Sequence, residues 1–115
     1  MASYVPDRGD LVWLQFDPQA GHEQAGRRPA LVLSPRRYNR LSGLMLCCPI
    51  TTRIKGYPFE VPLTDDRGVA SVVLSDQAKS LDWRARKASR KGRAPLSVVA
   101  GALGRLGALL EHDVG

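Results

Sequence analysis

The chain has 115 residues, 43% of them hydrophobic, which fits a single domain over residues 1–115 with a core of its own. A formal net charge of +6 favours an anionic partner, namely nucleic acid, an acidic protein or a membrane surface. No apolar run approaches the roughly 20 residues that span a bilayer, and the start lacks a signal-peptide pattern, so we expect a cytoplasmic protein and exclude a membrane-spanning one.

Short runs of strand-forming residues occupy the first two thirds of the chain. Strands are predicted at Leu11 to Phe16, Leu31 to Leu33, Leu44 to Cys48, Phe59 to Leu63 and Val69 to Leu74. Clusters of Pro, Gly, Ser and Asp between most of these runs are typical of turns. Closely spaced short strands indicate a small barrel.

Two adjacent cysteines lie at the end of the third predicted strand. In an extended strand, the side chains of Cys47 and Cys48 point to opposite faces. This spacing suits neither a routine disulfide nor a zinc knuckle, so we interpret both as small buried hydrophobic residues.

A basic segment runs from Lys79 to Arg93 and holds seven cations and one acid, Asp82, for a net charge of 7 − 1 = +6. The rest of the chain is neutral. Such a segment fits a nucleic-acid groove, and the aromatic ring of Trp83 within it is a candidate for stacking on a base. Trp13, on the first predicted strand, is interpreted as a core residue. The alternative for the whole segment is a solvated loop.

The pattern changes to a helical one after the basic segment. Apolar residues recur at steps of three and four and predict one helical face, formed by Leu96, Val99, Leu103, Leu106 and Leu110. Several glycines weaken the intrinsic helicity, so packing against the barrel must hold this helix. We therefore predict a mostly β (α+β) fold, a small SH3-like β-barrel with a C-terminal α-helix.

The loop before the second predicted strand carries the chemistry. Glu23 can take or give a proton, and the guanidinium of Arg28, just before Pro29, can bind a phosphate through a rigid fork of donors. Together they indicate a phosphodiester site. Each has a plainer alternative: Glu23 as a solvated acid, and Arg28 as an ion-pair partner of Asp10 or Asp17.

Several ordered motifs resemble those of the MazF/PemK family of toxin endoribonucleases over nearly the whole chain. The motifs are Gly9–Trp13, Glu23–Pro29, Pro49–Thr52, Lys55–Val61 and Asp76–Arg86. The resemblance implies a toxin of a type II toxin–antitoxin system that cleaves single-stranded mRNA at specific sequences and thereby inhibits translation and growth.

RNA carries its own nucleophile, the 2′-hydroxyl, so cleavage needs only a base, an acid and charge stabilisation. Glu23 is the candidate base, Arg28 stabilises the phosphorane, and the resemblance assigns a functional threonine to Thr51. His22 is an alternative proton carrier. The expected products are a 2′,3′-cyclic phosphate and a 5′-hydroxyl, and the donor to the leaving 5′-oxygen stays open.

The remaining candidates would bind the RNA. In the PemK-like branch an arginine stands at the position of Leu74, so that catalytic role does not transfer, and Asp76 and Gln77 are left to read a base edge or brace the loop. No metal or cofactor is predicted, because the carboxylates are scattered and the two histidines lack ligand spacing. The RNA-binding candidates are His22, Gln24, Arg27, Arg53, Lys55, Asp76, Gln77, Lys79, Trp83, Arg84 and Arg86.

The resemblance also implies a homodimer and an acidic, MazE-like antitoxin whose extended tail covers the RNA groove. Two other functions fit the same barrel: a non-enzymatic, CcdB-like toxin that binds DNA gyrase, and a plain RNA-binding barrel. Fold alone does not separate these classes. The loop from Glu23 to Arg28 with Thr51 separates them, because a gyrase binder has no need of it.

Overall fold

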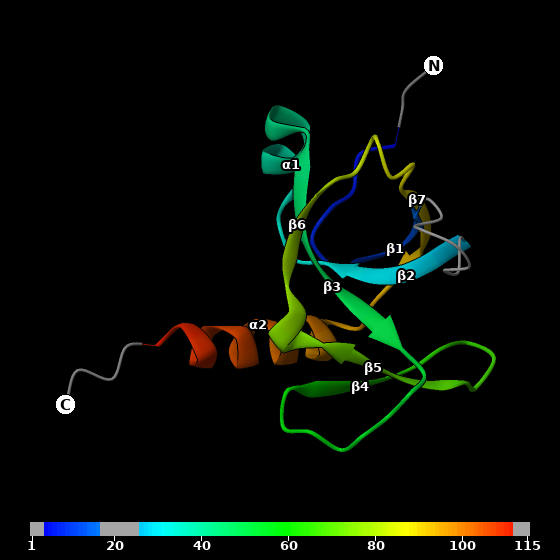
Figure 1. Cartoon of the computed structure of the whole chain (residues 1–115), viewed down its shortest axis with the longest axis vertical. Helices are drawn as coiled ribbons and strands as arrows, with labels where there is room; N and C mark the ends of the chain where they lie inside the picture. The colour runs from blue at the N-terminus through cyan, green and yellow to red at the C-terminus, as the bar shows by residue number, and fades with distance from the viewer. Residues whose placement is uncertain (1–3, 17–25, 112–115) are drawn as a thin grey trace, which may run out of the picture.

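The computed structural model describes residues 4–16 and 26–111. In these ranges the chain forms a mostly β fold with a curled sheet and a C-terminal helix, as predicted (Figure 1). The strands are β1 (Asp10–Phe16), β2 (Gly26–Val32), β3 (Leu44–Thr51), β4 (Glu60–Thr64), β5 (Ala70–Leu74), β6 (Lys79–Asp82) and β7 (Ser89–Arg93). The helices are α1 (Arg36–Ser42), the 3-10 turn η1 (Ser75–Gln77) and α2 (Leu96–Leu110).

The sheet curls because β3 pairs with three neighbours. The hydrogen-bonded order is β4-β5-β3-β2-β1-β7, and β6 also pairs with β3. Residues 44–47 of β3 lie beside β6, whereas Ile50 and Thr51 lie beside β5. A single strand thus passes from one antiparallel sheet into the next, and its far end reaches the loop that leads to β4 (Figure 1).

Two hydrophobic clusters form the core. Strand alternation sends Cys47 into one cluster with Val12 and Leu14, and Cys48 into the other with Leu11 and Leu31. Both thiols are free and buried, as predicted. Burial raises the pKa of Cys47 to about 12 and that of Cys48 to about 11, so both stay protonated near neutral pH.

The predicted strands are confirmed, but the sheet is larger than the apolar runs indicate. β2 begins at Gly26 and β3 continues to Thr51. The basic segment supplies β6 and β7, and β7 lies at an edge of the sheet, where polar residues face water. The helix α1 was also not predicted, because its polar sequence lacks an apolar face; it ends at Gly43 with φ of 77°.

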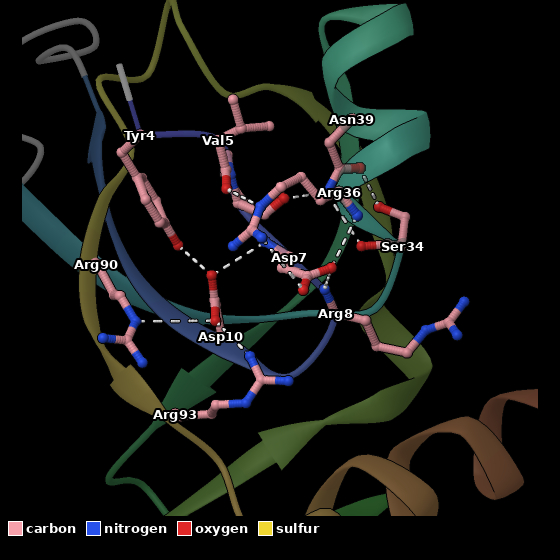
Figure 2. Close-up of polar contacts among 11 residues, drawn as sticks. Tyr4, Val5, Asp7, Arg8, Asp10, Ser34, Arg36, Asn39, Arg90 and Arg93 are labelled. Atoms are coloured by element: carbon pink, nitrogen blue, oxygen red, sulfur yellow. Dashed lines mark hydrogen bonds and ion pairs between the residues drawn. The ribbon is translucent and has the colours of Figure 1, made fainter. Parts of the chain in front are cut away.

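A buried carboxylate ties the N-terminal segment to β7 (Figure 2). Asp10 is 1% exposed, and its Oδ1 accepts a hydrogen bond of 2.8 Å from Arg93 Nη1 and lies 3.9 Å from Arg90 Nε. Its Oδ2 accepts from the Tyr4 hydroxyl at 2.5 Å and from the Asp7 backbone N–H at 3.0 Å. Burial and the neighbouring carboxylate raise the pKa of Tyr4. Part of the basic segment therefore serves the fold.

The helix α1 is fixed by the buried side chain of Asn39 (Figure 2). Its Nδ2 donates to the carbonyls of Pro6 at 2.8 Å and Ser34 at 3.0 Å, and its Oδ1 accepts from Ser34 Oγ at 2.6 Å. The backbone carbonyl of Asn39 accepts from Trp83 Nε1 at 2.8 Å. This bond connects α1 with the turn between β6 and β7.

The helix α2 forms as predicted, but the predicted apolar face is wrong in part. Val99 is buried, whereas Leu96 and Leu110 are 82% and 71% exposed. Small residues make the closest approach instead: a Cβ added at Gly101 would lie 3.3 Å from Val61 Cγ1 of β4. Leucine periodicity misses this face because Gly101 contributes no apolar side chain to the pattern. The helix faces the barrel through Val98, Val99 and Ala102, with Leu106 packed beside them.

Candidate active site

A cavity of about 580 Å³ opens where the ends of β2 and β3 meet the loop between β3 and β4 and the turn η1. Its wall combines apolar strand residues with cations and polar groups. The predicted site residues that line it are Arg28, Thr51, Arg53, Lys55, Asp76, Gln77, Lys79 and Arg86. We call this space the main cavity.

Arg28 and Thr51 face the main cavity from neighbouring strands. In the β2–β3 ladder Ala30 pairs with Pro49, and this antiparallel register, continued toward the strand ends, directs Arg28 toward Thr51. Arg28 is exposed, and it does not form the ion pair with Asp10 that is one alternative from sequence, because Arg90 and Arg93 hold that carboxylate. Asp17, the other acid of that alternative, lies outside the described residues, so a pairing with it stays a prediction.

The Thr51 hydroxyl is oriented by the backbone that follows it. Its Oγ1 accepts a hydrogen bond of 3.1 Å from the Arg53 N–H, so the hydroxyl proton can donate to another acceptor. Thr51 is half-buried at the end of β3. A phosphate oxygen between Arg28 and Thr51 would meet a cationic donor on one side and a neutral donor on the other.

A second cavity, of about 670 Å³, lies on the other side of the same pair. Arg28 and Thr51 line both spaces, and Trp13 and Lys91 line only the second. Trp13 is half-buried rather than a core residue, and Lys91 Nζ lies 5.3 Å from its ring centroid. Arg28 and Thr51 therefore form a ridge between two cavities, which gives an extended ligand room on both sides.

Arg86 is placed by the backbone of the turn that carries it. The Arg86 carbonyl accepts a hydrogen bond of 2.8 Å from Gln15 N–H of β1, and the Arg86 N–H donates at 3.0 Å to the carbonyl of Asp82. The Asp82 carboxylate caps the same turn by accepting from the N–H groups of Arg84 and Ala85. A fixed turn thus places Arg86 at the wall of the main cavity, which Arg28 also lines.

Asp76 and Gln77 are exposed on η1 at the rim of the main cavity. The Ser75 N–H donates to the Phe59 carbonyl at 3.2 Å, which ties η1 to the loop before β4. Carboxylate and amide groups together offer both acceptors and donors to a base edge. Their position suits the predicted reading of a base.

The structure does not bring every predicted residue into the main cavity. The prediction that Trp83 stacks on RNA is wrong: its indole is 4% exposed and packs in the core cluster of Val12 and Leu14. Arg84 lies over the Trp83 ring at 4.7 Å and away from the cavity wall. Arg27 donates to Ser89 Oγ and lies 5.5 Å from the Trp13 ring, so it faces a different side of β2 from Arg28.

His22, Glu23 and Gln24 lie outside the described residues, so their predicted roles stay predictions. The sequence predicts that base choice depends on the loops Arg36 to Leu41 and Arg53 to Tyr57, but it singles out neither Tyr57 nor Glu60 as a residue of the cavity wall. The signal for Tyr57 was an aromatic side chain among cations in a Gly/Pro-containing loop, but nothing in the sequence indicated that the Glu60 carboxylate is buried.

Within residues 4–16 and 26–111, no group of three or more His, Cys, Asp or Glu side chains is placed to hold a metal ion. None of the helices in that part of the chain is long and apolar enough to cross a bilayer.

The structure is that of a small, basic, curled β domain in which an arginine and a threonine line two neighbouring cavities, which places the protein in the small-barrel class. Residues 7–110 match the family of PemK-like, MazF-like toxins of type II toxin–antitoxin systems. The chain therefore belongs to this family, which confirms the resemblance seen in the sequence motifs.

Named relatives agree with this family. The chain is 56% identical over 92 residues to the endoribonuclease toxin MazF of Escherichia coli strain K12, covering 80% of this chain and 82% of the relative. It is 47% identical over 112 residues to the endoribonuclease toxin ChpB of the same strain, covering 91% and 94%. A crystal structure of MazE–MazF from Deinococcus radiodurans superposes with a TM-score of 0.88 at 59% identity, covering 96% of this chain and 100% of that chain.

Proposed function

We propose that this protein is the toxin of a type II toxin–antitoxin pair, a metal-independent endoribonuclease that cuts single-stranded mRNA at specific sequences in the cytoplasm. One observation carries the proposal: Arg28 and Thr51 line the same cavity, together with four further cations, Arg53, Lys55, Lys79 and Arg86. Five cations around one cavity favour a polyanion over a small neutral substrate. Membership in the toxin family and the endoribonuclease relatives support the same activity.

The reaction uses the substrate's own 2′-hydroxyl. Its oxygen attacks the adjacent phosphorus, the bond from phosphorus to the 5′-oxygen breaks, and the products are a 2′,3′-cyclic phosphate and a 5′-hydroxyl. The proton of the 2′-hydroxyl passes to the Glu23 carboxylate, and a second proton must reach the leaving oxygen. His22 is the alternative carrier for either proton.

Arg28 stabilises the charge that builds on the non-bridging oxygens in the transition state. Its guanidinium stays protonated throughout, so its role is electrostatic rather than that of a general acid. Thr51 supplies a neutral hydrogen bond to the phosphate, because its Oγ1 accepts from the Arg53 N–H and its hydroxyl proton is left to donate to a phosphate oxygen. The two groups together fix the phosphate for in-line attack.

The cations around the main cavity bind the backbone, and the rim selects the bases. Lys79 and Arg86 come from β6 and the turn after it, and Arg53 and Lys55 from the loop between β3 and β4, so cations from two parts of the chain line the path proposed for the RNA phosphates. Single-stranded RNA exposes its base edges, which donors and acceptors on η1 can read.

The activity is controlled by a protein partner in this proposal. Relatives have been crystallised as MazE–MazF complexes, and we propose a homodimer that binds an acidic antitoxin over the same cavity. A carboxylate-rich peptide competes with RNA phosphates for these cations, so inhibition should weaken as salt rises. Inhibition that is independent of salt would contradict this electrostatic competition.

The test is to incubate the purified protein with a long unstructured RNA in EDTA, map the cuts and identify the ends. We expect discrete cuts with cyclic phosphate ends, and Glu23→Gln should lower turnover by roughly 10²- to 10⁴-fold while leaving RNA binding largely intact. Binding without cleavage across several RNAs would contradict the enzyme and favour a plain RNA-binding barrel. Absence of both, with binding to gyrase, would favour a CcdB-like toxin.

A further inference from the structure

The loop between β3 and β4, residues 52–59, presents an aromatic ring at the mouth of the main cavity. It is the green loop below β4 in Figure 1. Tyr57 lines the cavity and is nevertheless 58% exposed, and Ile54 beside it is 52% exposed. The loop therefore shows an aromatic ring to solvent at the wall of the cavity in which the proposed substrate binds.

A buried carboxylate holds this loop from inside. Glu60, the first residue of β4, is 7% exposed, and its two oxygens accept from the backbone N–H groups of Lys55 at 3.1 Å and Gly56 at 2.9 Å. Gly56 has φ of 82°, a conformation that residues other than glycine rarely adopt. The Glu60 N–H donates to the Tyr57 carbonyl at 3.1 Å. The turn that carries Tyr57 is thus fixed before any ligand binds.

The helix α2 holds the same loop from outside. Arg105 Nε donates to the Pro58 carbonyl at 3.0 Å, and its Nη1 donates to the Gly101 carbonyl at 3.2 Å. Two independent elements therefore fasten the loop on either side of Tyr57. Fixing an exposed aromatic ring lowers the entropic cost of stacking a ligand on it.

The surroundings of Tyr57 favour a nucleotide as that ligand. Lys55 Nζ lies 5.8 Å from the ring centroid, and Arg53 lines the same wall of the cavity. An aromatic face flanked by cations is the arrangement that binds single-stranded nucleic acid, since the ring stacks on a base and the cations bind the phosphates on either side. One nucleotide with its two phosphates engages the ring and both cations at once, whereas an apolar side chain alone would use only the ring; an acidic peptide that engages all three is an outcome that the test below distinguishes.

We propose that Tyr57 is the platform on which one base of the RNA stacks, that Lys55 and Arg53 bind the flanking phosphates, and that Glu60 is a positioning residue for this platform. The inference rests on the proposed ribonuclease function and names where a base next to the cleaved bond is held. It assigns a specificity contact to the loop between β3 and β4, in addition to the contacts proposed for Asp76 and Gln77 on η1.

The experiment uses an RNA oligonucleotide that contains the mapped cleavage sequence, with a 2′-O-methyl group at the cleaved ribose and 2-aminopurine at one position at a time. We expect the fluorescence of 2-aminopurine to fall on binding at one position for the wild-type protein and for Tyr57→Phe, which keeps the ring. Tyr57→Leu should abolish this fall and raise Kd by roughly 5- to 150-fold, the range for one base stacked on an aromatic side chain.

Tyr38→Leu is the matched control, because Tyr38 is also an exposed tyrosine, 44% accessible, on α1 and not in the wall of either cavity. It should bind RNA like the wild type. Glu60→Ala should raise Kd by a similar factor to Tyr57→Leu. The double variant should bind RNA no more weakly than Tyr57→Leu alone, because both changes remove the same stacking contact. Additive losses would overturn the positioning role.

Each outcome separates this inference from the proposed function. Cleavage by the wild type together with unchanged Kd for Tyr57→Leu would overturn the stacking platform and leave the ribonuclease intact. An equal loss for Tyr57→Phe and Tyr57→Leu would also overturn it, because the hydroxyl rather than the ring would then matter. A Tyr57→Leu variant that loses affinity for an acidic antitoxin peptide and not for RNA would assign the loop to a protein partner instead.

Discussion

The basic segment is one run of charge in the sequence, but the cations of its first half, Lys79 to Arg86, and of its second half, Lys87 to Arg93, have different surroundings in the structure. Lys79 and Arg86 line the main cavity, whereas Arg90 and Arg93 lie against the buried carboxylate of Asp10. A cation beside a buried carboxylate is partly neutralised, so Arg90 and Arg93 contribute less charge to an RNA site than their number indicates, although Arg93 and Lys91 line the second cavity. A run of like charges is therefore not by itself a binding surface.

Loss of the buried carboxylate should have the largest effect on stability. Asp10→Ala removes the acceptor of Tyr4 and Arg93, and the two arginines that it leaves are half exposed, so we expect a loss of about 1.5–3 kcal/mol in the free energy of unfolding, measured by urea denaturation. Asp66→Ala, at an exposed acid, is the control and should change the free energy by less than about 0.5 kcal/mol. A small effect of Asp10→Ala would mean that the second half of the segment is not structural.

The second-largest effect is expected for the buried indole of Trp83. Trp83→Phe keeps most of the packing and loses the hydrogen bond to the Asn39 carbonyl, so we expect a destabilisation of about 1–2 kcal/mol with RNA affinity unchanged. Thermal melting and RNA titration on the same samples measure both quantities. A weaker RNA complex with unchanged stability would restore the stacking role that the structure excludes.

Single cations of the first half should have the smallest effects. Lys79→Ser should weaken RNA binding and reduce the slope of log K against log salt by about 0.7, the value for one phosphate contact to single-stranded RNA. Arg90→Ser, the matched change in the second half, should leave the slope nearly unchanged, because Arg90 lines neither cavity. Equal reductions would contradict the division of the segment.

The parts of the fold that depend on local sequence patterns could be predicted from the sequence. Alternation along β3 predicts that Cys47 and Cys48 enter opposite clusters, and the structure confirms it. β6 and β7 were not predicted, because their polar sequences show no regular alternation of apolar residues. Their pairing with β3 and β1 depends on the tertiary structure. On α2, the close approach of Gly101 to Val61 was not predicted, because a glycine adds no apolar side chain to the helical pattern.

The site was predictable where a motif fixes both residue type and strand position. Arg28 and Thr51 were named from sequence, and both line the two cavities. The two tryptophans were not predictable: charged neighbours in the sequence made Trp83 look exposed, but its ring turns into the core and Trp13 lies at a cavity wall. Sequence neighbours do not reveal which way a side chain turns in a tight turn.

The most direct test of the account compares two adjacent arginines. Arg28 lines both cavities, whereas Arg27 donates to Ser89 and lies beside Trp13. Single-turnover cleavage of a mapped RNA should fall by roughly 10²- to 10³-fold for Arg28→Ala, the range for loss of one donor to a developing oxyanion, and by only a few-fold for Arg27→Ala. Equal losses, or full activity of Arg28→Ala, would contradict the claim that the ridge of Arg28 and Thr51 is the centre of the site.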